Sequence, residues 1–133
     1  MRKITEIIIH CSATIEGKDY IVADIDRWHR ARGFCKIGYH YVIYRDGSIH
    51  AGRTISETGA HCIGHNANSI GICYIGGLAK DGRTPKDTRT PEQREAMRSL
   101  IKQLKQKFPE ASIHGHREFA NKSCPCFRVP EEL

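Results

Sequence analysis

The sequence predicts an α/β domain with a central mixed β-sheet flanked by helices. Two apolar runs typical of buried strands, residues 7–9 and 69–75, lie far apart in the chain. Two segments with the apolar spacing of amphipathic helices, 19–32 and 91–104, alternate with these runs. Such alternation within the length of one ordinary domain favours a sheet covered by helices, so we expect residues 1–133 to form a single domain.

The first expected strand covers residues 4–9 and leads directly into His10. The unbroken run of three isoleucines at its end indicates burial on both faces, as in a central strand. A histidine that leaves a buried strand into small polar residues is well placed to line a cleft. A structural histidine is the plainer alternative.

A helix is expected over residues 19–32, with Asp19 as its N-cap. Its apolar stripe consists of Ile21, Ile25 and Trp28. A β-rich segment follows at 38–44, and the Asp-Gly pair at 46–47 predicts a hairpin turn. Regular strand alternation would place Tyr39 and His40 on opposite faces.

Residues 53–68 are expected to form a loop that carries two further histidines, His61 and His65, as cleft candidates. The second helix has a clear start, because Thr90 can cap it and Gln93 can complete a capping box. A short strand is then expected at 111–114.

The segment 114–126 concentrates residues that bind metals or move protons. It offers one histidine and one cysteine as ligands, with His114 or His116 and Cys124 or Cys126 as the competing choices. His10 could supply a third ligand from far upstream. A catalytic zinc takes three protein ligands and keeps a fourth position for water, whose pKa it lowers towards about 7.

Composition narrows the partners and the location. The net charge is +6, which favours polyanionic partners, but the chain has no nucleic-acid motif. We expect no membrane insertion, since no apolar run approaches the roughly 20 residues that span a bilayer. An acidic residue at Glu6 argues against a secretory signal, so the six cysteines are expected to be reduced and the protein cytoplasmic before any release.

Several motifs together resemble the zinc-dependent N-acetylmuramoyl-L-alanine amidases of the type-2 amidase and peptidoglycan-recognition-protein superfamily, especially the amidase-type lysozymes of bacteriophages. The matching stretches are Ile9–Thr14, Trp28-His29, Ile37–Ile43, Arg45–Gly47, Gly59–His61, Asn68–Ile72, Thr90–Gln93, Gly115–Glu118 and Lys122–Pro125. They fall in family order across nearly the whole chain.

This resemblance implies one Zn²⁺ per chain, bound in a cleft on one face of the sheet by His10, His116 and Cys124. It implies that Tyr39 and Lys122 form the catalytic pair. The family cleaves the amide between N-acetylmuramic acid and L-alanine in peptidoglycan.

Other roles follow from these assignments. Lys122 would stabilise the oxyanion, and Tyr39 would orient the water or take part in proton transfer. Glu118 is an alternative base, or else a residue in a supporting salt bridge. His61 is expected either to line the substrate groove or to be structural, and Cys126 to be a bystander.

We expect a monomeric phage or prophage endolysin that acts on peptidoglycan or muropeptides, without nucleic acid. A cytoplasmic amidase that recycles muropeptides and a non-catalytic peptidoglycan-recognition module are the alternatives. The presence of all three candidate ligands favours an enzyme over the recognition module.

Overall fold

A five-stranded mixed sheet forms the centre of the computed structural model, which describes residues 2–129 and 133. Its strands are, in spatial order, β4 (Ile49–Ala51), β3 (Tyr41–Ile43), β5 (Ser69–Tyr74), β1 (Glu6–Cys11) and β7 (Ser112–Gly115). Strand β1 lies between β5 and β7 and runs parallel to both, and β3 runs parallel to β5, whereas the edge strand β4 is antiparallel to β3. The mixed sheet predicted from the sequence is therefore confirmed.

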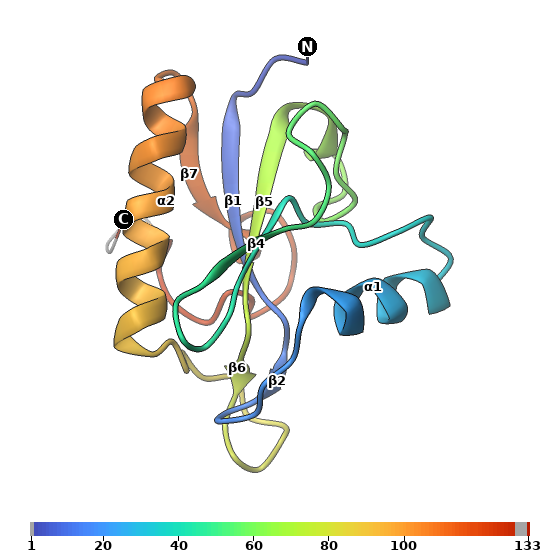
Figure 1. Cartoon of the computed structure of the whole chain (residues 1–133), viewed down its shortest axis with the longest axis vertical. Helices are drawn as coiled ribbons and strands as arrows, with labels where there is room; N and C mark the ends of the chain where they lie inside the picture. Colours follow the sequence, from blue (N-terminus) through green and yellow to red (C-terminus); the bar gives the residue numbers. More distant parts are fainter. Residues whose placement is uncertain (1, 130–132) are drawn as a thin grey trace.

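The long helix α2 (Pro91–Lys107) covers one face of this sheet (Figure 1). The side chains at its buried interface with the sheet include Ile7, Ile9, Ile43, Ile70, Ile72, Tyr74, Met97, Leu100, Ile101 and Leu104. Thr90 caps the helix as predicted, because its hydroxyl accepts the N–H of Gln93 at 3.1 Å and the Gln93 side chain accepts the N–H of Thr90 at 2.9 Å.

The shorter helix α1 (Val22–Ala31) packs against the opposite face, where Ile25 contacts a second apolar cluster that includes Val42. Val42 pairs with Cys73, and Cys73 pairs with His10, so these three side chains project from the same face of the sheet. His10 therefore points to the α1 side, away from α2.

The start of α1 differs from the prediction. Asp19 does not cap it; this carboxylate pairs with Arg45 instead, at 2.9 Å. The first turn is held by Asp24, which accepts the N–H of Ile21 at 2.9 Å. Ile21 is 49% exposed, so the predicted apolar stripe is buried only further along the helix, at Ile25.

The segment before β3 is irregular, since the strand begins only at Tyr41. Strand alternation therefore does not govern the two residues before it. The ring of Tyr39 lies 6.5 Å from that of His61, and the ring of His40 lies 5.9 Å from it. Both side chains face the same histidine, contrary to the alternation expected from a regular strand.

Short elements complete the described part of the chain. They are β2 (Thr14–Ile15), β6 (Gly77–Leu78) and the 3-10 helices η1 (Asn66–Asn68) and η2 (His116–Glu118). Strands β2 and β6 form a small parallel sheet of their own, which the sequence did not predict. Among the helices of residues 2–129, none combines the length and apolar character that crossing a bilayer requires.

Candidate metal centre

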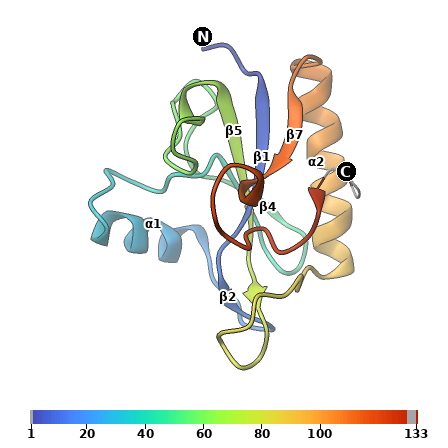
Figure 2. The same ribbon diagram turned by 180° about the vertical axis from the view of Figure 1, so that it is seen from behind.

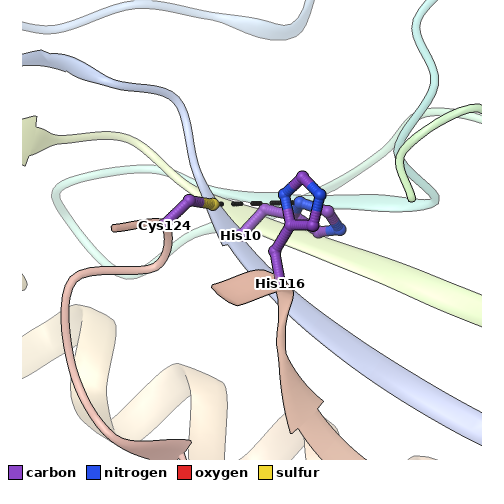
Figure 3. Close-up of side chains that lie close together, drawn as sticks. All are labelled: His10, His116 and Cys124. Carbon is purple, nitrogen blue, oxygen red and sulfur yellow. Dashed lines mark hydrogen bonds between the residues drawn. The ribbon is translucent and has the colours of Figure 1, made fainter. Parts of the chain in front are cut away.

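Three side chains from distant parts of the chain converge at the end of β1. His10, His116 and Cys124 place one potential ligand atom each within 4.8 Å of one another (Figure 3). The Cys124 Sγ lies 3.9 Å from His10 Nδ1, and the rings of His10 and His116 have centroids 4.5 Å apart. Tetrahedral zinc with its usual bond lengths separates a nitrogen and a sulfur ligand by about 3.5 Å, so this spacing fits a metal.

Each ligand candidate is positioned by a different element. His10 lies in the second half of β1 and is only 1% exposed. His116 opens η2 directly after β7 and is half-buried. Cys124 lies in the segment after η2, which loops past the end of β1 (Figure 2). The centre thus forms where two parallel strands, β1 and β7, reach their C-terminal ends.

The Cys124 segment is anchored by its backbone. The N–H of Arg117 donates to the Cys124 carbonyl at 2.8 Å, and the N–H of Cys11 donates to the Cys124 sulfur at 3.2 Å. The Tyr74 hydroxyl donates to the Pro125 carbonyl at 2.6 Å. The Cys11 contact holds the sulfur in place, and the sequence could not predict it because a backbone N–H leaves no residue-type signal.

The rival residues lie elsewhere. His114 Nδ1 is 3.0 Å from a Glu118 oxygen, and its Nε2 is 2.7 Å from the Ser112 hydroxyl. Cys126 directs its sulfur towards Cys11, 4.0 Å away. The structure therefore brings His116 and Cys124 to His10, whereas the side chains of His114 and Cys126 have other partners.

Burial keeps the imidazoles of the centre neutral. It lowers the pKa of His10 well below the usual value, and positive charge on His61, His116 and Lys122 would lower it further. Burial followed by the charge of Lys122 also lowers the pKa of His116. Neutral imidazole is the form that binds metals, so the donor set is suited to a cation.

The two predicted catalytic residues, Tyr39 and Lys122, both lie near the three candidate ligands. The Tyr39 ring lies 5.0 Å from the His10 ring, and burial raises the pKa of its phenol well above the usual value, with smaller contributions from Cys73 and Cys124. A protonated phenol can donate a hydrogen bond. Lys122 is exposed, yet close enough for its charge to lower the pKa of both candidate ligand histidines, His10 and His116.

Glu118 and His61 lie beside the centre with defined partners. One Glu118 oxygen faces His114, and the other accepts the N–H of Gly115 at 2.6 Å, so this carboxylate braces the turn after β7. His61 Nδ1 lies 2.8 Å from His10 Nε2. The predicted contact between His61 and substrate stays a prediction, as does the role of Glu118 as a base.

The candidate site offers a metal ion two nitrogen ligands and one sulfur ligand. Structural zinc sites are closed by four protein ligands, whereas three ligands leave a coordination position for water or substrate. The described residues provide three, with a phenol and an ammonium group nearby. The arrangement could hold a metal ion with an open coordination position on an α/β fold.

Comparisons with known proteins identify the family. Residues 1–127 match the family model described as N-acetylmuramoyl-L-alanine amidase. The endolysin of Klebsiella phage KP32 is 39% identical over 126 residues, covering 95% of this chain and 83% of the relative. The endolysin of Escherichia phage T7 is 40% identical over 121 residues, covering 91% and 80%.

A solved structure agrees with these sequence relatives. The N-acetylmuramoyl-L-alanine amidase LysC from Clostridium intestinale URNW superposes with a TM-score of 0.82 at 27% identity, covering 98% of this chain and 82% of that one. The chain belongs to the N-acetylmuramoyl-L-alanine amidase family. The resemblance inferred from the sequence motifs is thereby confirmed.

Proposed function

We propose that this protein is a zinc-dependent N-acetylmuramoyl-L-alanine amidase that serves as a phage or prophage endolysin. The observation that carries the proposal is the convergence of His10, His116 and Cys124 on the α1 side of the sheet. Family membership and the phage endolysin relatives support the reaction and the biological role. Residues 1–133 would act as one amidase domain with one zinc ion.

The role proposed for each residue follows from the three candidate ligands and the side chains beside them. Zinc held by the three ligands would lower the pKa of its water and polarise the substrate carbonyl. Lys122 is the exposed cation that would stabilise negative charge on the carbonyl oxygen. Tyr39 would hold the attacking water or the leaving nitrogen by a hydrogen bond from its phenol.

Hydrogen bonds from backbone N–H groups hold the candidate ligands in place. The hydrogen bond from the Cys11 N–H holds the sulfur, and the bond from the Gly115 N–H to the Glu118 carboxylate holds the turn that presents His116. Such supporting contacts keep the reacting groups close to a productive geometry, which is a large part of catalysis in enzymes of this kind.

Digestion of purified peptidoglycan tests the proposal. We expect new L-alanine amino termini without new reducing sugar ends, and we expect a chelator to abolish the activity until zinc is restored. Reducing ends, or full activity after complete metal removal, would contradict it. Comparing intact sacculi with soluble muropeptides separates the lytic role from recycling, because an endolysin must cleave the intact polymer.

A further inference from the structure

The side chain of His61 occupies a slot that the surrounding backbone leaves open for it. A Cβ atom added to Gly71 would lie 2.7 Å from two carbon atoms of the His61 ring. A Cβ added to Gly59 would lie 2.5 Å from the same ring. Side-chain carbons do not approach so closely in packed interiors, so the two glycines create the space that this imidazole fills.

Hydrogen bonds from Asn66 and Arg2 hold the loop that carries His61. The Asn66 side-chain oxygen accepts the N–H groups of His61 and Cys62, each at 2.9 Å. The Arg2 guanidinium donates to the Asn66 carbonyl at 3.3 Å and to the Ser69 carbonyl at 2.8 Å. The position of His61 is therefore tied to the N-terminus and to β5, and does not depend on the loop alone.

The ring nitrogens form a chain that starts at the metal centre. His10 turns Nδ1 towards Cys124 Sγ, at 3.9 Å, and Nε2 towards His61 Nδ1, at 2.8 Å. His61 in turn places its Nε2 3.1 Å from the hydroxyl of Ser69, which is fully buried in β5. Among the described residues, these contacts give each of the four ring nitrogens of His10 and His61 one partner.

Metal binding by His10 determines which atom donates in each of these hydrogen bonds. A histidine nitrogen that binds a metal carries no proton, so a neutral His10 that ligates through Nδ1 holds its proton at Nε2. Among the described residues, the partner of that N–H is His61 Nδ1, which accepts the hydrogen bond. His61 then carries its own proton at Nε2, and this N–H donates a hydrogen bond to the Ser69 hydroxyl.

We propose that His61 is a positioning residue of the metal centre, which accepts the hydrogen bond from His10 and thereby fixes its tautomer and ring orientation. This inference rests on the proposed function, because it requires His10 to be a zinc ligand. Ligand histidines usually give their second N–H to a carboxylate, a carbonyl or water, and losing that partner weakens metal affinity by about 10- to 100-fold. Here an imidazole occupies the acceptor position.

Substitution of His61 tests the acceptor role. His61→Phe fills the slot with a ring of similar shape but offers no acceptor, so the dissociation constant for zinc, measured by competition with a chromophoric chelator, should rise about 10- to 100-fold. His61→Asn places an amide oxygen where Nδ1 stood and should restore most of the affinity. His65→Phe, in the same loop but bonded to Glu6, is the matched control and should bind zinc like the unmodified protein.

A second measurement uses the unmodified protein and does not depend on any variant folding. Imidazole ¹⁵N spectra of the zinc-loaded protein should show His10 protonated at Nε2 with Nδ1 bound to metal, and His61 protonated at Nε2. A proton on His61 Nδ1 would overturn the inference, since that nitrogen could not accept from His10.

The outcomes separate this inference from the proposed function. Failure of the unmodified protein to bind zinc or release L-alanine amino termini would defeat the proposed function. Unchanged zinc affinity in His61→Phe, together with a raised KM, would leave the amidase intact and assign His61 to the substrate. Weakened zinc affinity with an unchanged KM at saturating zinc supports the positioning role.

Discussion

Two cysteines that are two positions apart have different surroundings. The Cys124 sulfur accepts the N–H of Cys11 at 3.2 Å and faces His10, whereas the Cys126 sulfur donates to the Gly77 carbonyl at 3.3 Å. Hydrogen bonding to the Cys11 thiol, followed by burial, raises the pKa of Cys126. A thiol that keeps its proton is a poor metal ligand, so the surroundings favour Cys124 over Cys126 as the candidate ligand.

The first prediction uses this pair. Cys124→Ser should weaken zinc binding by more than the roughly 10- to 100-fold typical of losing an outer partner, because a hydroxyl is a much poorer zinc ligand than a thiolate. Cys126→Ser should retain the metal. Metal content and the zinc dissociation constant of both purified variants are the measurements, and equal losses would show that the assignment of Cys124 is wrong.

The second prediction concerns Lys122. Lys122→Met should lower kcat by about 10²- to 10³-fold, the usual effect of removing one oxyanion donor, while zinc content is unchanged. Lys122→Arg should recover part of the rate because it restores a cation. Lys102→Met, an exposed lysine of α2, is the control. A normal kcat in Lys122→Met would refute the oxyanion role.

At the scale of elements, the connection before α2 is fastened by a buried cation. The side chain of Arg89 is 1% exposed, its guanidinium carbon lies 3.4 Å from the centre of the Phe127 ring, and Asp87 bonds it at 2.8 and 2.9 Å. Arg94 reaches the same carboxylate from α2 at 3.0 Å. This cluster joins the connection, the helix and the segment after η2.

The third prediction is a pH dependence of stability. Burial by itself would raise the pKa of Asp87, but hydrogen bonds and charge from Arg89, aided by Arg94, hold it below the usual value. A depressed folded pKa stabilises the protein above the unfolded value of about 3.9, and this contribution disappears as the pH falls through the folded pKa.

Asp87→Asn should therefore cost about 3 kcal/mol of unfolding free energy at pH 7, with the difference from the unmodified protein shrinking below about pH 4. Urea unfolding at several pH values measures it. Glu95→Gln, at an exposed carboxylate of α2, is the control and should have a smaller effect at pH 7. A pH-independent cost would contradict the electrostatic explanation.

The elements predicted correctly from the sequence are those with strong local determinants. The capping box of α2 and the Asp-Gly hairpin are formed by neighbouring residues, so their patterns predict them. The start of α1 and the small β2–β6 sheet were missed because they depend on contacts with distant segments, such as the Asp19–Arg45 pair. The ligand set came from the family resemblance, and the contact of His61 with His10 had no local signal.

At the scale of the whole molecule, the candidate centre joins the first strand of the sheet to the C-terminal segment. The fourth prediction follows: zinc should stabilise the entire fold and not the site alone. A ligand that binds only the folded state adds RT ln(1 + [L]/Kd), about 4 kcal/mol at a thousandfold excess over Kd. The unfolding temperature should rise with free zinc and fall in a chelator. Cys124→Ser should lose most of this response, and an equal zinc response in that variant would contradict the link.

The separation of the ligands along the chain has a consequence for when activity begins. His10 and Cys124 are 114 positions apart, and β1 pairs with β5 and β7, which follow much later in the sequence. Contacts between such distant segments form late in folding, because the intervening chain must first be closed into a loop. During synthesis, the centre therefore stays unassembled until the chain has been made as far as Cys124. A fragment that ends before Cys124 lacks one of the three candidate ligands, so we expect it to have no amidase activity.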